Sequence, residues 1–217
     1  MVDFVQARRA MVDGQVRPHD VTDLRIIAAL LDVPRERFVP PAQRALAYLD
    51  AEVPVAPART LLKPMVFAKM LQAAGIAAGE RVLDLGCASG YSSAVLGRLA
   101  GSVVALEEDA ALARLAGETL AALGAANVSV AAGPLTAGWA QGAPYDAILV
   151  EGALEVVPDA LTAQLKDGGR LVAVTGSVPM GKATLYRKVS GRITAVPLFD
   201  AAAPLLAGFA RPAAFVF

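Results

Sequence analysis

The stretch Val82-Leu83-Asp84-Leu85-Gly86-Cys87-Ala88-Ser89-Gly90-Tyr91 decides the fold of this chain. Its apolar beginning is typical of a strand, and the turn that follows leads directly into the helical pattern Ser92-Ser93-Ala94-Val95-Leu96. Gly86 and Gly90 lack a Cβ, so the backbone can turn sharply and approach a bound molecule, while free N–H groups of the first helical turn face the same space. The stretch therefore predicts a site for a nucleotide-like ligand.

The spacing of the glycines distinguishes between two kinds of nucleotide site. The dinucleotide fingerprint needs glycines two and five residues after the first, and this chain has Ala88 and Tyr91 at those positions. A nicotinamide-dependent dehydrogenase is therefore the weaker hypothesis.

An acidic residue follows the next predicted strand. Glu107 ends the apolar run Ser102-Val103-Val104-Ala105-Leu106, twenty-one residues after Gly86. An acid at this place can accept hydrogen bonds from both hydroxyls of a ribose. The pattern resembles the S-adenosylmethionine site of the class I methyltransferases, where the Gly-rich turn holds the methionine end and the acid holds the ribose. The alternative is an ordinary βαβ unit with a solvated acid at the end of its strand.

The resemblance gives a set of candidate cofactor-binding residues in and around the turn: Asp84, Gly86, Cys87, Ala88, Gly90, Tyr91 and Glu107. Asp84 can bridge through water to the ammonium of the donor, or simply secure the turn. Cys87 is expected to be a small packing residue whose backbone matters more than its thiol.

Composition limits the classes of protein that the chain can represent. With 217 residues, of which 56% are hydrophobic and 18% charged, it is long enough for one α/β domain with a sizeable core. Twenty basic and twenty acidic residues give no net charge, and no Lys/Arg cluster is interleaved with aromatic residues. We therefore expect no nucleic-acid partner.

The numbers of cysteine and histidine residues limit which metal sites and disulfides the chain can form. One cysteine excludes an intramolecular disulfide, and one cysteine with one histidine cannot form a zinc site of the usual kind, so we expect no metal. No secretory pattern begins the chain, and no apolar run approaches the roughly twenty residues of a membrane span. We expect a cytoplasmic protein without a membrane partner, either a monomer or a weak homo-oligomer.

Strands and helices alternate from about residue 80 onward. The expected strands lie at 81–85, 102–107, 127–131, 145–150 and 169–175, and the expected helices at 90–99, 109–123 and 159–166. This alternation predicts a parallel sheet covered on both faces. A C-terminal hairpin is expected around Ser190-Gly191-Arg192, and residues 213–217 are a candidate closing strand.

The first sixty residues have a different character. Helices are expected over 3–14 and after an N-cap at Asp20 or Thr22, and the irregular segment 34–50 predicts a cap or lid. Pro64 suits the first turn of a helix that runs to about Ala74.

Taken in order, the chain resembles the protein-L-isoaspartate O-methyltransferase family over nearly its full length. The matching segments include Met11-Val12-Asp13-Gly14-Gln15, Ala47-Tyr48-Leu49-Asp50 and Ala143-Pro144-Tyr145-Asp146-Ala147-Ile148, together with 33–40, 81–91, 138–139 and 164–172. The resemblance implies a class I, Rossmann-like α/β fold with a seven-stranded, mostly parallel sheet, a C-terminal antiparallel hairpin and an N-terminal helical cap. It also implies a single domain over 1–217, with a substrate-facing cap at 1–60 and a cofactor-binding sheet at 61–217.

Function follows from the same resemblance. It implies S-adenosyl-L-methionine as cofactor, a protein or peptide carboxylate as methyl acceptor, and a role in the repair of isoaspartyl damage. Because a carboxylate with a pKa of about 4 is already ionised at neutral pH, it needs no base, whereas an amine or alcohol acceptor usually does. The one histidine, His19, lies in a predicted loop, and the lack of an obvious base favours a carboxylate acceptor.

The chain departs from the family at three places. Ala58-Arg59-Thr60-Leu61-Leu62-Lys63-Pro64 stands where the family reads roughly Gly-Gln-Thr-Ile-Ser-x-Pro, so Leu62 replaces a serine of the acceptor site. Gly133-Pro134-Leu135 replaces Gly-Asp-Gly, whose acid meets the adenine amino group, so backbone carbonyls would have to serve. Glu151-Gly152-Ala153 replaces a run of small residues and puts a carboxylate at the carboxyl edge of the sheet.

These departures leave roles open. Leu62 and Glu151 are the candidate catalytic residues, and Gly133 and Pro134 join the cofactor-binding candidates. Glu151 is either a base or a group that orients the acceptor or the donor, or else a solvated loop acid. Arg59 and Lys63 can recognise a substrate carboxylate or remain solvated charges.

Because Leu62 cannot donate the hydrogen bond of a serine, we expect weak or absent methylation of isoaspartyl peptides. The alternatives are a homologue that binds S-adenosylmethionine and methylates a different acceptor, and one that has lost catalysis.

Overall fold

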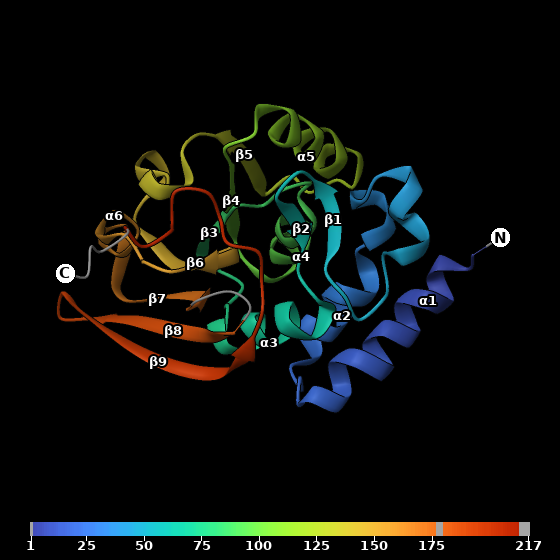
Figure 1. Cartoon of the computed structure of the whole chain (residues 1–217), viewed down its shortest axis with the longest axis horizontal. Coiled ribbons are helices and arrows are strands. Elements are labelled where there is room, and N and C mark those ends of the chain that lie inside the picture. Colours follow the sequence, from blue (N-terminus) through green and yellow to red (C-terminus); the bar gives the residue numbers. More distant parts are fainter. Residues whose placement is uncertain (1, 177–179, 213–217) are drawn as a thin grey trace, which may run out of the picture.

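A seven-stranded sheet runs through the computed structural model, which describes residues 2–176 and 180–212 (Figure 1). Its strand order is β5-β4-β3-β6-β7-β8-β9; the pairs from β5 to β7 are parallel, and β8 and β9 are antiparallel additions. The strands are β3 (Arg81–Leu85), β4 (Ser102–Glu107), β5 (Val128–Ala132), β6 (Tyr145–Leu154), β7 (Leu165–Thr175), β8 (Gly181–Val189) and β9 (Arg192–Ala201). The predicted α/β sheet with its C-terminal hairpin is confirmed.

The strand order reverses between β3 and β6. Chain order runs outward from β3 through β4 to β5, and the chain then returns to place β6 and β7 on the other side of β3. In open α/β sheets, ligands bind outside the carboxyl ends of the strands at such a reversal. The Gly-rich turn follows β3, and Glu151 comes directly after Val150, the last residue of β6 that pairs with β3, so both lie at this reversal.

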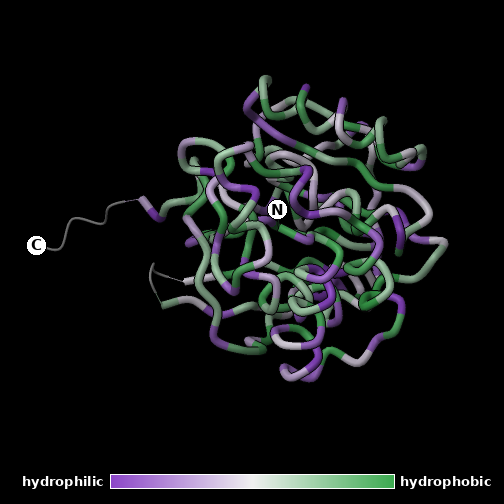
Figure 2. Tube along the Cα trace, turned by 90° about the vertical axis from the view of Figure 1, so that its right-hand side faces the viewer, coloured by the Kyte–Doolittle hydropathy of each residue, from purple (hydrophilic) through white to green (hydrophobic). Residues whose placement is uncertain are grey.

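Helices cover the sheet as the alternation predicts. They are α3 (Pro64–Ala74), α4 (Tyr91–Leu99), α5 (Ala110–Ala122) and the short α6 (Asp159–Ala163). Asp109 caps α5 by accepting hydrogen bonds from the backbone of Ala111 and Leu112, and Pro64 occupies the first turn of α3 as predicted. Along α5, at the top of the view in Figure 2, hydrophilic residues alternate with hydrophobic ones, as expected for a helix with one face on the sheet.

The N-terminal segment is a helical cap, as predicted. Its helices are α1 (Phe4–Met11) and α2 (Leu24–Asp32), joined and followed by the short helices η1 (Val12–Val16), η2 (Arg17–His19), η3 (Arg35–Phe38) and η4 (Pro41–Leu46). The predicted N-cap was wrong, because Asp23 caps α2 by accepting from the backbone N–H of Arg25 at 2.8 Å. Asp20 instead adopts a left-handed conformation at the end of η2, and the N–H of Thr22 donates to Gln72.

A small hairpin that the sequence analysis missed connects the cap to α3. It consists of β1 (Val53–Ala56) and β2 (Arg59–Leu61), with Val53 opposite Leu61. Pro54 and Pro57 hid this hairpin, because proline removes a donor that a strand normally uses. The hairpin places Arg59 against the end of β4.

The far end of the described chain follows the carboxyl end of β6. The N–H of Ala153 donates to the carbonyl of Pro204 at 2.8 Å, and the N–H of Leu206 donates back to Ala153 at 3.0 Å. Leu206 is buried, and its Cδ1 lies 3.4 Å from where a Cβ on Gly86 would stand. This packing was not predicted, and the candidate closing strand at 213–217 lies outside the described residues.

Several boundaries differ from the prediction. β6 continues to Leu154, four residues beyond the predicted end at 150, and β7 begins at Leu165 rather than at 169. Helix α6 is correspondingly short and ends at Ala163.

Candidate active site

Asp84 is the polar centre of the Gly-rich turn. It is fully buried, and its Oδ2 accepts hydrogen bonds from Ser92 Oγ at 2.7 Å and Ser93 Oγ at 2.5 Å. Its Oδ1 is buried and has no partner among the residues that the structure describes. Burial raises the pKa of Asp84 to about 7; the two serine hydroxyls oppose this shift, and Glu107 adds to it. Asp84 therefore has one acceptor oxygen without a hydrogen-bond partner in the described structure.

The glycines of the turn serve packing as much as ligand approach. Gly86 and Gly90 have φ of +77° and +93°, which other residues rarely adopt. A Cβ on Gly90 would lie 3.1 Å from the Cβ of Ala116, so this glycine lets α5 pack closely on the turn. Ala88 also has a left-handed φ, of 50°.

Cys87 behaves as the sequence analysis expected. It is buried, and burial together with the nearby Asp84 and Glu107 raises the pKa of its thiol well above the usual value. A protonated thiol of this kind is a poor nucleophile, so Cys87 packs within the turn.

Glu107 is not the solvated strand-end acid of the alternative hypothesis. It is fully buried, and its Oε1 accepts from Arg59 Nε at 3.2 Å and from the backbone N–H groups of Glu108 and Asp109. Its Oε2 accepts one bond in the described structure, from the N–H of Ala88 at 2.9 Å. The acid thus ties the end of β4 to the Gly-rich turn.

Arg59 is buried at the end of β4. It is 6% exposed and forms ion pairs with Glu107 and, at 2.6 Å, with Glu108, so it is not a solvated charge. These two carboxylates occupy its guanidinium, which lies at the end of β4. Lys63 is half-buried and precedes α3.

Arg35 belongs to the same region, and the sequence analysis missed it. It is 1% exposed, donates from Nη2 to the carbonyl of Leu62 at 2.8 Å and from Nε to the carbonyl of Ala47 at 2.7 Å. Its guanidinium carbon lies 4.6 Å from the centre of the Tyr91 ring. Burial lowers the pKa of Arg35, although Tyr91 and Glu151 oppose that shift. Arg35 thus joins the cap, Leu62 and the Gly-rich turn.

Glu151 lies on β6 rather than in a loop, and its side chain is half-buried. Its Oε1 is buried and has no hydrogen-bond partner among the described residues. Burial raises the pKa of Glu151 well above the usual value; Asp84 raises it further, and Arg35 opposes the shift. Leu62, which replaces the family's serine, is also buried.

The remaining candidates lie at the edge of this region or away from it. The N–H of Gly133 donates to the carbonyl of Glu107 at 3.0 Å, so Gly133 and the exposed Pro134 follow the buried acid closely. A Cβ on Gly133 would lie 3.3 Å from Trp139. His19 is exposed, and its Nδ1 lies 2.8 Å from the carbonyl of Gln15 on the adjoining helical segment.

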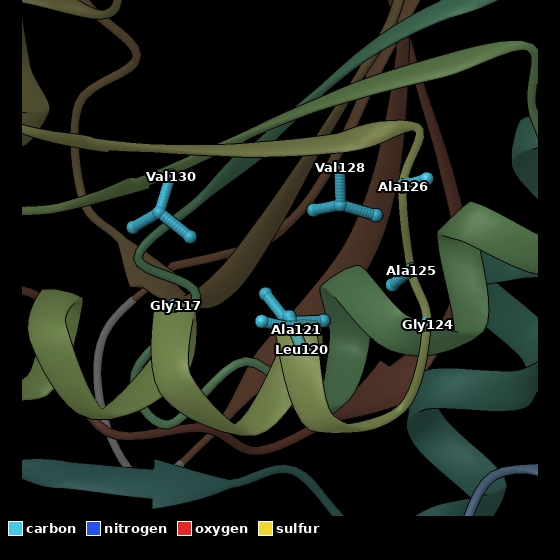
Figure 3. Close-up of a pocket in the computed structure, with 8 residues that line it drawn as sticks. All are labelled: Gly117, Leu120, Ala121, Gly124, Ala125, Ala126, Val128 and Val130. Carbon is cyan, nitrogen blue, oxygen red and sulfur yellow. The ribbon is translucent and has the colours of Figure 1, made fainter.

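A separate pocket of about 440 Å³ lies between α5 and β5 (Figure 3). Figure 3 shows Val128 and Val130 facing Leu120 and Ala121 across it. Its lining consists of aliphatic side chains and glycines and carries no titratable group, so it offers no chemistry.

Within 2–176 and 180–212, no three His, Cys, Asp or Glu side chains are grouped so that they could hold a metal ion. In the same residues, no helix has the length and apolar character that crossing a membrane requires.

The reversal between β3 and β6, with a buried acid ending the neighbouring β4, is the arrangement of a class I methyltransferase, the class that uses S-adenosylmethionine as methyl donor. Comparison with known proteins identifies the family within this class. The family model described as protein-L-isoaspartate(D-aspartate) O-methyltransferase matches residues 6–196. The chain belongs to the protein-L-isoaspartate O-methyltransferase family and is a methyltransferase of this class.

Individual relatives agree with the family model. A protein-L-isoaspartate O-methyltransferase of Rhodopseudomonas palustris is 41% identical over 88% of this chain and 92% of its own length. The corresponding protein of Koribacter versatilis is 38% identical over 92% of this chain and 90% of its own.

Solved structures show the same fold. A protein-L-isoaspartate O-methyltransferase superposes with a TM-score of 0.82 at 25% identity, covering 93% of this chain and 66% of that one. A Plasmodium falciparum protein described as a putative member, solved with S-adenosyl-L-homocysteine, gives a TM-score of 0.79 at 19% identity over 95% of this chain and 99% of that one.

Proposed function

We propose that the chain transfers the methyl group of S-adenosyl-L-methionine to the side-chain carboxylate of an isoaspartyl residue in a damaged protein or peptide. The observation that carries the proposal is the family match over residues 6–196, which includes both the cap and the Gly-rich turn. The product is a methyl ester, and the reaction would serve protein repair.

The residues of the turn fit this donor. Asp84 has a buried, unpartnered Oδ1 that suits a ligand ammonium, and Glu107 accepts one bond at Oε2, which leaves room for a ribose hydroxyl. Gly86, Cys87, Ala88, Gly90 and Tyr91 would contribute backbone and shape around the methionine end. Gly133 and Pro134, next to Glu107, would contribute backbone carbonyls toward the adenine.

For this methyl transfer, the protein has to align the donor with the acceptor and exclude water from the site, and it has to do little else. When bound, S-adenosylmethionine supplies a methyl group on a sulfonium, which an ionised carboxylate accepts directly. The buried cap residues Phe38 and Leu62 would exclude water, and the buried charge of Arg35 would favour an anionic acceptor. No residue has to remove a proton from the acceptor.

Because Leu62 and Glu151 depart from the family pattern, we still predict weak methylation of isoaspartyl peptides. The comparisons give no support to the alternatives of a different acceptor or lost catalysis, because the relatives carry the same name throughout.

One assay tests the proposal. Purified protein is incubated with labelled S-adenosylmethionine and an isoaspartyl peptide, with the aspartyl form of the same peptide as control, and base-labile methyl ester is measured. We expect ester only on the isoaspartyl form. The rate of ester formation should be up to roughly a hundredfold lower than with a relative that has a serine in place of Leu62. Binding of S-adenosylhomocysteine without any ester on the isoaspartyl peptide would contradict the proposal.

We further propose that the protein acts in the cytoplasm as a monomer or weak homo-oligomer, without nucleic-acid or membrane partners. Its balanced charge supports this proposal. Light scattering at two protein concentrations would test the oligomeric state.

A further inference from the structure

Glu151 and Asp84 lie on the same face of the sheet, beneath the cap. On β6, Glu151 lies between Leu149 and Ala153, which both belong to the core that the cap helices cover, at an irregularity in the register with β7. Its carboxyl group interacts electrostatically with Asp84 and Arg35. On β3, Val82 belongs to the same core, so Asp84 points to the same side. Asp84 pairs with Leu149 in the register of the two strands, which places Glu151 just beyond it at the carboxyl edge.

Titratable and charged groups that interact electrostatically with Glu151 come from four segments of the chain. They are Asp84 from β3, Cys87 from the turn, Tyr91 from α4 and Arg35 from η3. None of them donates a hydrogen bond to the buried Oε1 of Glu151 in the described structure. A buried polar oxygen without a partner is unfavourable, and in a site it is commonly satisfied by a ligand.

The protonation state of Glu151 determines which kind of ligand atom it can bind. Burial and the neighbouring Asp84 raise the pKa of Glu151, which shifts its titration toward the neutral acid. A neutral carboxylic acid is a hydrogen-bond donor, and its natural partner is an anionic oxygen. The donor's ammonium already has the free Oδ1 of Asp84 available.

Position 62 at the acceptor end is a buried leucine, whose side chain has no hydroxyl to hold an anionic oxygen. Arg35 connects this position to the same cluster by its bond to the carbonyl of Leu62. A carboxylate placed there beside an ionised Glu151 would be repelled, whereas beside a neutral Glu151 it gains a bond.

We propose that Glu151, as a neutral carboxylic acid, donates a hydrogen bond to the acceptor carboxylate and so determines which acceptors this site takes. The inference rests on the proposed carboxylate methylation. Glu151 keeps its proton throughout, while the acceptor oxygen forms a bond to the methyl carbon and the bond from that carbon to sulfur breaks. The non-attacking oxygen of the acceptor receives the hydrogen bond.

Two variants test the proposal, Glu151→Gln and Glu151→Ala, with Glu118→Gln as a matched control on the exposed surface of α5. Their kcat/KM is measured with the isoaspartyl peptide between pH 5.5 and 9, and S-adenosylhomocysteine affinity is measured by calorimetry. Because the amide still donates a hydrogen bond, we expect Glu151→Gln to stay within about fivefold of the unaltered protein. We expect Glu151→Ala to lose about 10- to 100-fold in kcat/KM.

The pH profile separates this role from a structural one. The unaltered protein should be active with Glu151 protonated and lose activity as pH rises through its pKa, and Glu151→Gln should lack that decline. All variants should bind S-adenosylhomocysteine within about threefold of the unaltered protein, which also confirms that they are folded.

Three results with an active unaltered protein would overturn the inference. The first is a kcat/KM of Glu151→Ala equal to that of the unaltered protein, and the second is a Glu151→Gln variant as inactive as Glu151→Ala. The third is a loss of S-adenosylhomocysteine affinity equal to the loss in kcat/KM, which would mean that Glu151 binds the donor. An unaltered protein that binds S-adenosylhomocysteine but makes no ester overturns the proposed function, and this inference with it.

Discussion

Single buried charges set the properties of this site. Asp84, Glu107 and Arg35 are each at most 1% exposed, and each has different hydrogen-bond partners. Asp84 binds serine hydroxyls, Glu107 binds backbone N–H groups and an arginine, and Arg35 binds backbone carbonyls. Only the first two could be predicted from sequence, because an acid at a strand end next to a Gly-rich turn is a local pattern. The partners of Arg35 lie on segments distant in sequence, and no local pattern indicates them.

The raised pKa of Asp84 has a consequence for stability. An aspartate titrates near 3.9 in an unfolded chain and at about 7 here, so the folded state binds more protons between these values. Stability should therefore fall as pH rises from about 4 to 7, and Glu151, whose pKa is also raised, contributes in the same direction.

We predict that Asp84→Asn makes the melting temperature less dependent on pH across this range. The asparagine oxygen can still accept from Ser92 and Ser93, so the fold is kept. Thermal unfolding followed by circular dichroism at pH 5, 6, 7 and 8 measures the slope. A slope equal to that of the unaltered protein would mean that Asp84 is ionised throughout.

The hairpin of β1 and β2 is the element that sequence patterns identified least well. Two prolines obscured its strands, and its turn contains Ala58 with φ of +55°, a conformation that favours glycine. The long apolar strands of the sheet were predicted within a few residues because they are buried on both faces. Short edge elements depend on contacts such as that between Arg59 and Glu107, which local sequence does not show.

We predict that Ala58→Gly stabilises the protein by about 0.5–1 kcal/mol, since glycine removes the left-handed strain. Ala111→Gly, in the first turn of α5, is the control, and it should destabilise by a similar amount because its backbone is helical. Urea denaturation gives both free energies of unfolding. The same sign for both substitutions would contradict the assignment of strain to Ala58.

At the scale of the whole molecule, cap and sheet share one core. Met11 and Leu30 of the cap lie in the same buried cluster as Phe67, Val82 and Leu149. The cap helices and the sheet should therefore unfold together rather than as separate domains.

We predict a single unfolding transition by two probes. Trp139, the one tryptophan of the chain, packs on the face of the sheet opposite the cap, while circular dichroism also reports the helices of the cap. Fluorescence and circular dichroism should give the same midpoint in urea. Separate midpoints would show that the cap is an independent unit.

Leu206 supports the Gly-rich turn from the face opposite the cap, although it lies far along the chain from Gly86. While the chain is being synthesised, a ribosome that has released only the segment through β7 exposes the turn without this support. Gly86 and Gly152 then lack their contacts with Leu206. The surroundings of the turn are therefore completed late in translation, and a message cut short before codon 206 encodes a sheet whose central turn lacks one wall.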